Sequence, residues 1–361
     1  MLSRRGFLTG MAGSGMASSL RLSSSAETPP SITPVRFHVP ERACDCHVHV
    51  FGDPSRFPFA ASRTYTPESA SAAQLLAIHR ALHISRVVIV QPSVYSTDNS
   101  CALDAMKQYG PGARGIVVLP SETPSTTLDD MESAGIRGVR INLGTAGDTN
   151  VAGARDRLKS AIEQIQGRKW HVQVYAALPV IAGLSDLVLS SPVPVVFDHF
   201  GGAKGAAGVQ QPGFDKLLQV VRSGKGYVKI SGAYRASNGA PDYPDVAPLA
   251  RALIAANPHR ILWGSDWPHP DTGDGRKPSD VSPLLRVDDG HLLNQLAAWV
   301  PHATLRKTIL VDNPATLYRY RELTRNCETR QGEVAKNSDP RVGRVTPAAK
   351  SKLKGAASTK K

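Results

Sequence analysis

The sequence predicts an α/β protein with a single catalytic domain folded as a (β/α)8 TIM barrel. Apolar, β-branched runs alternate with helical patterns from Ala43 onward, and eight such units fit into roughly 280 residues, which favours a closed barrel over an open doubly wound sheet. The strand cores are almost continuously apolar, as in parallel sheets covered by helices. Polar residues recur at the carboxyl ends of the strands, where such a barrel places its active site.

The apolar runs define the expected strands. The second reads Val87-Val88-Ile89-Val90 and the sixth reads Val195-Val196-Phe197. In neither do apolar and polar residues alternate, as they do in a strand with one face exposed to solvent. We expect strands at 43–50, 86–92, 114–119, 136–143, 171–178, 193–199, 227–233 and 260–265. The intervening segments have helical periodicity. We expect helices at 68–83, 99–109, 124–134, 150–167, 179–190, 212–223 and 244–256, and at 290–310 after the last strand.

The two ends of the chain differ from the barrel. The N-terminus is typical of a secretory signal of the twin-arginine type. It has Arg4-Arg5 before Phe7-Leu8, then a short apolar stretch and a run of small residues that could form a cleavage site. We therefore divide the chain into a signal peptide (1–26), a Pro-rich linker (27–40), the barrel domain (41–322) and a basic, disordered tail (323–361). The signal predicts a periplasmic protein; if the first segment is only a flexible arm, the protein is cytoplasmic. No segment is long enough for a transmembrane helix.

The formal charge of +13 belongs mainly to the ends. Residues 1–26 carry +3 and residues 321–361 carry +7, which leaves +3 for 27–320. A nearly balanced body argues against specific nucleic-acid binding by the folded part. The sequence does not indicate an oligomeric state.

The strongest functional signal comes from two histidines in the N-terminal part of the barrel sequence and an aspartate in its C-terminal part. Side chains two residues apart on a strand share a face, so His47 and His49 point together. Asp266 follows the last strand in Gly264-Ser265-Asp266. Because the first and last strands of a closed barrel are neighbours, the three side chains should form one site.

Polar side chains end most of the other strands as well. They are Ser93 after the second, Arg140 and Asn142 on the fourth, Tyr175 on the fifth, Asp198 and His199 on the sixth, Lys229, Ser231 and Arg235 on or after the seventh, and His269 after the eighth. Each has a plainer interpretation: a packed core histidine, an arginine that neutralises an internal carboxylate, or a capped turn. Unpaired charges are costly inside a barrel, so their recurrence at one end indicates an active site.

Two chemical schemes fit these residues. The imidazole nitrogens of His47, His49 and His199 with the carboxylate of Asp266 suit a borderline cation such as zinc, which makes bound water a nucleophile near neutral pH. Without a metal, the histidines could donate hydrogen bonds to a developing oxyanion while Asp266 acts as general base on water. The sequence leaves both open.

An ordered series of motifs resembles the amidohydrolase-related hydrolases, most closely their 2-pyrone-4,6-dicarboxylate lactonase branch. The likeness covers about residues 43–320. It rests on Asp45-Cys46-His47-Val48-His49-Val50-Phe51-Gly52, Arg56-Phe57-Pro58-Phe59, Val90-Gln91-Pro92-Ser93, Thr97-Asp98-Asn99, Arg137-Gly138-Val139-Arg140-Ile141-Asn142, Phe197-Asp198-His199-Phe200-Gly201, Ile261 through Pro270 and Asp312 through Tyr318.

The resemblance implies an amidohydrolase-like barrel that opens cyclic esters with water. It implies that His47, His49 and His199 surround the scissile carbonyl or a metal, and that Asp266 activates water. The substrate's polar and anionic groups would be held by Arg140, Arg235, Tyr175 and Ser93, to which we add Asn142 and His269. Arginine is apt because its planar fork matches a carboxylate. Members with and without a divalent ion are known, so the cofactor stays open.

One departure from that branch affects the expected substrate. The loop after the fourth strand, Leu143-Gly144-Thr145-Ala146-Gly147-Asp148, lacks the further basic residue of the dicarboxylate lactonases. A muconolactone-like or sugar lactone is therefore as plausible a substrate as the pyrone dicarboxylate. The alternatives are a metal-dependent decarboxylase of an aromatic or unsaturated acid on the same barrel, and an exported binding protein without catalysis.

Overall fold

The computed structural model describes residues 32–272 and 275–320. The chain divides into two units, Met1–Arg319 and Tyr320–Lys361, and the barrel lies in the first. The predicted signal peptide, the predicted tail and residues 27–31 of the predicted linker lie outside the described residues. The described part of the linker is irregular and is held to the body, since the backbone N–H of Arg36 donates to Asn294 Oδ1 at 2.7 Å.

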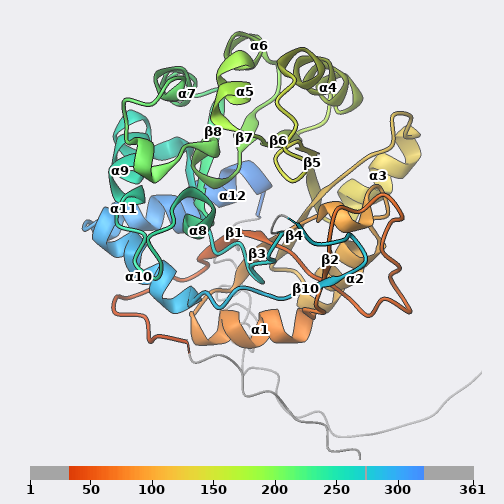
Figure 1. Cartoon of the computed structure of the whole chain (residues 1–361), viewed down its shortest axis with the longest axis horizontal. Coiled ribbons are helices and arrows are strands. Elements are labelled where there is room, and N and C mark those ends of the chain that lie inside the picture. The colour runs from red at the N-terminus through yellow and green to blue at the C-terminus, as the bar shows by residue number, and fades with distance from the viewer. Residues whose placement is uncertain (1–31, 273–274, 321–361) are drawn as a thin grey trace, which may run out of the picture. The chain divides into compact units, whose positions relative to one another are not determined.

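Eight parallel strands form the predicted barrel. They are β1 (Cys44–Val48), β3 (Arg86–Val90), β4 (Ala113–Val117), β5 (Ile136–Asn142), β6 (His171–Tyr175), β7 (Val195–Phe197), β8 (Gly226–Ser231) and β9 (Ile261–Gly264). Each pairs with the next in parallel, in chain order. Figure 1 shows the strands in the middle and the helices around them. The predicted fold class is confirmed.

The first and last strands meet, although their junction is less regular than the others. Val48 bridges Trp267 in parallel. The N–H of His49 donates to the carbonyl of Trp267 at 2.7 Å, and the N–H of Asp266 donates to that of His47 at 2.9 Å. The adjacency on which the predicted site depends is therefore present.

The helices cover the outside of the barrel, and several are shorter than predicted. They are α1 (Ala72–Ala81), α2 (Ser100–Tyr109), α3 (Ser125–Ser133), α4 (Val151–Gln164), α5 (Leu178–Gly183), α6 (Ser185–Ser190), α7 (Phe214–Arg222), α8 (Ala233–Ala236), α9 (Val246–Ala256), α10 (Asp289–Trp299), α11 (Ala303–Lys307) and α12 (Asn313–Tyr318). Helix α1 begins late because Ser71 and Gln74 form a capping box.

Two of the predicted helices are interrupted. The segment 179–190 is split into α5 and α6 next to Gly183, a poor helix former. The segment 290–310 breaks at Val300, where φ is −132° and ψ is 81°. Pro301 follows, and a proline disfavours helical backbone in the residue before it.

Helix α12, beyond the predicted 290–310, was not predicted, and neither were several shorter elements. Three of the shorter ones matter here. They are α8 and the two-residue strands β2 (Thr66–Pro67) and β10 (Val281–Ser282), which pair in parallel with each other. Elements of two to four residues are too short to show a hydrophobic period. Within the described residues, no helix has the length and apolar character needed to cross a membrane.

Candidate active site

The structure brings the two histidines of β1 and the aspartate after β9 together at the carboxyl end of the barrel. The Nε2 atoms of His47 and His49 lie 3.4 Å apart. Asp266 Oδ1 lies 3.5 Å from His47 Nε2 and 3.6 Å from His49 Nε2. His199, which follows β7, places its Nε2 at 3.8 Å from the same oxygen. Three imidazole nitrogens thus converge on one carboxylate oxygen.

The tautomer of His49 follows from its surroundings. Its Nδ1 lies 2.8 Å from the carbonyl oxygen of Val90, and a carbonyl can only accept a hydrogen bond. The proton is therefore on Nδ1. Burial, with help from Arg140, lowers the pKa of His49 to about 3, so its Nε2 carries a lone pair at neutral pH. Burial likewise lowers the pKa of His199 to about 4.

The two oxygens of Asp266 have different environments. Oδ2 accepts hydrogen bonds from the Tyr234 hydroxyl at 2.7 Å and from Arg235 Nε at 2.5 Å. Oδ1 is buried and has no hydrogen-bond partner among the described residues. Burial alone would raise the pKa of Asp266, but Arg235, followed by the histidines, holds it well below its ordinary value. The residue is an ionised carboxylate with one oxygen available.

These groups fit a divalent cation. His47, His49 and Asp266 each offer a ligand atom, and these atoms lie within 4.8 Å of one another. The orphaned Oδ1 and the lone pair of His49 both face the shared space. Nitrogen and carboxylate donors of this kind suit zinc or a similar ion.

A second group with the same spacing is less suitable for a metal. It consists of His47, Asp198 and His199. Asp198 already faces two cations, because Arg140 Nη2 lies 3.3 Å from its Oδ2 and Lys229 Nζ lies 3.6 Å from its Oδ1. A further cation there would meet like charges in a buried setting.

Arg140, Arg235 and Tyr175, which the sequence analysis assigned to substrate binding, border the histidines. Arg140 is buried and also donates to the carbonyl of Gln91 at 3.2 Å. Arg235 pairs with Asp266 through Nε. The ring of Tyr175 lies edge-on to that of His199, with centroids 5.0 Å apart. Both arginines are thus paired with carboxylates of the chain while they face the site.

The side chains of Asn142 and His269 make hydrogen bonds to neighbouring residues of the chain. The Asn142 amide donates to Thr145 Oγ1 at 2.9 Å and accepts from the Thr145 N–H at 3.1 Å, which fixes the loop after β5. His269 Nε2 lies 3.0 Å from Asp289 Oδ1. Neither side chain contacts the cluster of histidines through a hydrogen bond among the described residues.

Ser93 lines a cavity of about 540 Å³ together with Arg140 and Asn142. The β4–α3 loop and α4, including Asp156 and Arg157, also line it, whereas the three converging histidines and Asp266 do not. Its volume is ample for a small lactone with a side chain. The cavity adds Arg157, which the sequence analysis did not single out.

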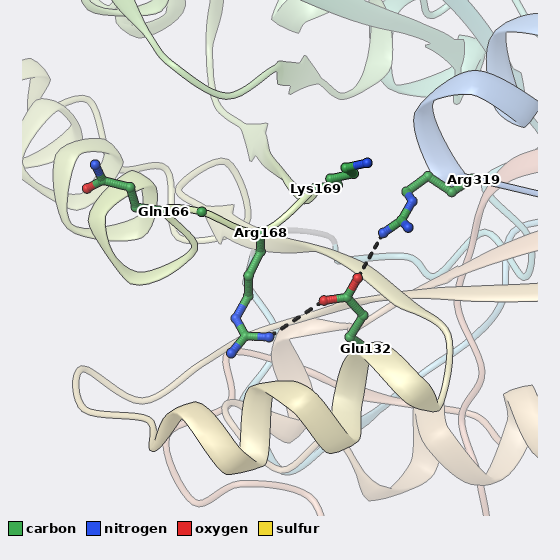
Figure 2. A pocket seen from close by; sticks show the side chains of 6 residues that line it. Glu132, Gln166, Arg168, Lys169 and Arg319 are labelled. Atoms are coloured by element: carbon green, nitrogen blue, oxygen red, sulfur yellow. Dashed lines mark hydrogen bonds and ion pairs between the residues drawn. The ribbon is translucent and has the colours of Figure 1, made fainter.

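A second cavity, of about 500 Å³, lies away from this site. Figure 2 shows Glu132 between Arg168 and Arg319, and the ion pairs measure 3.6 and 2.8 Å. Glu132 and Lys169 precede β5 and β6, so the cavity opens at the amino ends of the strands. In this fold that end serves stability rather than catalysis.

Sequence reasoning gave no role to several residues that contact the site. Tyr234 donates to Asp266. Lys229 Nζ lies 3.4 Å from His47 Nδ1 and donates to Gln173 Oε1 at 2.6 Å. Tyr65 is buried near Ser93, and burial raises its pKa to about 12. The only available signal was position: Lys229 and Gln173 occupy the same strand faces as Ser231 and Tyr175.

Comparison with known proteins gives a consistent result. Residues 44–320 match the family described as Amidohydrolase. The chain is 37% identical over 289 residues to a 4-sulfomuconolactone hydrolase from Rhizobium radiobacter, covering 79% of this chain and 92% of that protein. It is 35% identical over 293 residues to a 2-pyrone-4,6-dicarboxylate hydrolase from Comamonas testosteroni, covering 78% and 92%. A solved structure from Pseudomonas putida, assigned as a 2-pyrone-4,6-dicarboxylic acid hydrolase, superposes with a TM-score of 0.64 at 32% identity, covering 79% of this chain and all of that one.

Proposed function

The chain belongs to the amidohydrolase family, and we propose that it is a hydrolase that opens a small anionic or polyhydroxylated lactone with water. Relatives named as hydrolases of 4-sulfomuconolactone and of 2-pyrone-4,6-dicarboxylate support this proposal, since both act on cyclic esters that carry acidic groups. The observation that carries it is the orphaned, ionised oxygen of Asp266 facing three imidazoles.

The charge of the buried cluster favours an anionic substrate. Three cations, Arg140, Arg235 and Lys229, surround two carboxylates, Asp198 and Asp266. The histidines are neutral at pH 7 because burial lowers their pKa values. Arg140 and Arg235 lie at the histidines, and a substrate carboxylate or sulfonate can accept from N–H groups of Arg235 that Asp266 does not use. A 25% identical relative of known structure has citric acid bound, which is in keeping with this preference.

The chain's own residues can carry out most of the reaction. Asp266 Oδ1 accepts a proton from water as the oxygen of that water attacks the ester carbonyl, and returns the proton to the ring oxygen as the acyl C–O bond of the ring breaks, which leaves an open-chain hydroxy acid. Tyr234 and Arg235 hold Oδ2 and so fix the direction of Oδ1. The Nη groups of Arg235, which have no hydrogen-bond partner among the described residues, are left to bind a substrate carboxylate. Tyr175 packs against His199 and limits how that ring can turn.

We further propose that His47, His49, His199 and Asp266 hold one divalent cation, with zinc as the first candidate. Support comes from His49, whose Nε2 is a lone-pair donor and cannot give a hydrogen bond to an oxyanion while neutral. When bound, such an ion lowers the pKa of water and polarises the carbonyl. A decarboxylase and a binding protein without catalysis are not needed to account for these residues.

A panel of lactones tests the proposal. The purified protein should release acid from anionic lactones such as 2-pyrone-4,6-dicarboxylate, detected with a pH indicator, and should act more slowly on neutral lactones of the same ring size. Metal content and activity would be measured before and after chelation and after zinc is restored. Absence of acid release from every lactone, or release of carbon dioxide from an unsaturated acid instead, would contradict the assignment.

Export remains part of the proposal and rests on the sequence alone. Arg4-Arg5 and the apolar stretch after them support a twin-arginine signal. Replacing both arginines by lysine should leave the protein in the cytoplasm of a bacterial host with that export system, whereas the unchanged chain should reach the periplasm. Equal distribution of the two in cell fractions would remove the support.

A further inference from the structure

The junction between β1 and β9 is the least regular seam of the barrel, and it carries the proposed catalytic pair. Neighbouring strands elsewhere share three to five register pairs, whereas this seam has the single bridge between Val48 and Trp267. The register of β1 against β3 also shifts between Asp45 and Val48. The spacing of His47 and Asp266 therefore depends on few backbone hydrogen bonds.

A side chain compensates for the small number of backbone hydrogen bonds between β1 and β9. Asp45 is fully buried, and its Oδ1 accepts the backbone N–H of His47 at 3.1 Å and that of Ser265 at 3.0 Å. One oxygen thus ties the strand that carries His47 to the residue before Asp266. The strands are close here, since a Cβ on Gly264 would lie 2.8 Å from the backbone nitrogen of His47.

Two residues from the helical layer hold Asp45 in turn. His79 Nε2 of α1 lies 3.4 Å from Asp45 Oδ2, and His79 Nδ1 lies 2.8 Å from the hydroxyl of Tyr109 on α2. Burial raises the pKa of Tyr109, so its O–H is available to donate to Nδ1. His79 then carries its proton on Nε2 and donates it to Asp45. In this series of hydrogen bonds, from Tyr109 through His79 to Asp45, each donor meets an acceptor.

We propose that Asp45 is a positioning residue that sets the distance between His47 and Asp266, and that His79 and Tyr109 fix its orientation. The inference rests on the proposed function only in that the pair is taken to be catalytic. Asp45 accepts hydrogen bonds from backbone N–H groups, so the positioning of His47 and Asp266 depends on its acceptor oxygen more than on its negative charge. An asparagine can supply the same Oδ1 acceptor, because His79 can change tautomer to meet an amide; an alanine cannot.

The experiment compares Asp45→Ala with Asp45→Asn and with Leu253→Ala, which removes a fully buried side chain from α9 and serves as a matched destabilised control. Displacement of a reacting group by about 1 Å costs on the order of 100-fold in rate. We expect Asp45→Ala to lower kcat for lactone hydrolysis by 10- to 100-fold with little change in KM. Asp45→Asn and Leu253→Ala should stay within about threefold of the unchanged protein at a temperature where all are folded. Tyr109→Phe, which removes one hydroxyl, should lower kcat by only a few-fold and covers the case in which Asp45→Ala does not fold.

A readout independent of turnover separates this inference from the proposed function. The ring ¹⁵N signals of His47 and His49, in protein labelled at histidine, should move in Asp45→Ala and stay in place in Asp45→Asn and Leu253→Ala. If the unchanged protein hydrolyses no lactone, the proposed function fails while these signals still test the role of Asp45. Unmoved signals in Asp45→Ala or Tyr109→Phe, or equal loss of kcat in Asp45→Asn or Leu253→Ala, would overturn it.

Discussion

Replacement of Asp266 by asparagine is the most direct test of the proposed chemistry, because the structure specifies how the amide would sit. Tyr234 and Arg235 both donate to Oδ2, so the amide oxygen must take that position. The NH₂ group then replaces Oδ1 and faces the lone pair of His49 Nε2, 3.6 Å away from the present oxygen. The variant would keep its buried hydrogen bonds and therefore its fold.

The same geometry predicts a large loss of activity. An amide N–H in place of Oδ1 can neither accept a proton from water nor bind a cation. Loss of a positioned general base costs about 10²- to 10⁴-fold in rate, which corresponds to about 3–5 kcal/mol of transition-state stabilisation. We expect kcat for an anionic lactone to fall by at least 100-fold while the protein remains folded, with a lower unfolding midpoint because Arg235 loses its carboxylate partner.

Acid release under saturating substrate, with circular dichroism to verify folding, is the assay. Asp289→Asn is the matched control, because Asp289 is also a buried carboxylate that accepts from a histidine, at 3.0 Å from His269 Nε2, without facing the three converging imidazoles. Turnover by Asp266→Asn within tenfold of the unchanged protein would refute the role of this carboxylate, as would an equal loss in Asp289→Asn.

Three further outcomes are expected. Without metal, the free energy of unfolding should fall as the pH is lowered from 6.5 to about 4, because burial lowers the pKa of His49 to about 3 and that of His199 to about 4, so the unfolded chain binds more protons than the folded one in that range. Urea unfolding should show a slope of up to about 1.4 kcal/mol per pH unit for each histidine. A free energy of unfolding that does not change with pH would contradict the neutral, buried state of these histidines. Lys229→Met should destabilise the fold by about 1–3 kcal/mol in the same assay, because Asp198 keeps Arg140 as a partner while Gln173 Oε1 loses its buried donor; an unchanged stability would contradict the contribution of these contacts. Arg157→Gln should raise KM for a lactone with an acidic side chain several-fold and leave a neutral lactone unaffected, since Arg157 lines the same cavity as Arg140. Arg155→Gln should change neither, because Arg155 lies on the same helix and is also paired with an aspartate, as Arg157 is with Asp148, but does not line the cavity; equal effects on both lactones would exclude the cavity as the place of the acidic group.

The barrel and the meeting of its first and last strands could be predicted because they depend on local pattern and closure. Runs such as Val87–Val90 are buried on both faces, and only a parallel sheet covered by helices accepts many of them. Alternation along a strand then places His47 and His49 on one face, and closure brings Asp266 to them. Nothing beyond residue types and spacing is needed for this step.

The partners of each charge could not be predicted, because they depend on register and side-chain reach. Arg140 and Arg235 were assigned to the substrate, yet each is also paired with a carboxylate of the chain, Asp198 and Asp266. Asp45 lies two residues before His47, but its two backbone partners, His47 and Ser265, come from opposite ends of the barrel sequence. The register shift between β1 and β3 that follows Asp45 also leaves no mark in the pattern of apolar residues.

Backbone conformation at the ends of β7 and β9 adds to what strand alternation and closure provide. His199, Asp266 and His269 adopt φ values of +48°, +68° and +62°, in the left-handed region that residues other than glycine seldom occupy. Such conformations cost about 1–3 kcal/mol each and persist where the surrounding structure holds them. At Asp266 the holding groups are visible: the Tyr234 and Arg235 hydrogen bonds on its side chain and the bond from its N–H to the carbonyl of His47. A regular extended backbone after β9 would continue along the strand direction, whereas the left-handed turn redirects Asp266 toward the barrel axis. The left-handed backbone of Asp266 and its buried, orphaned Oδ1 are therefore held in place by the same contacts.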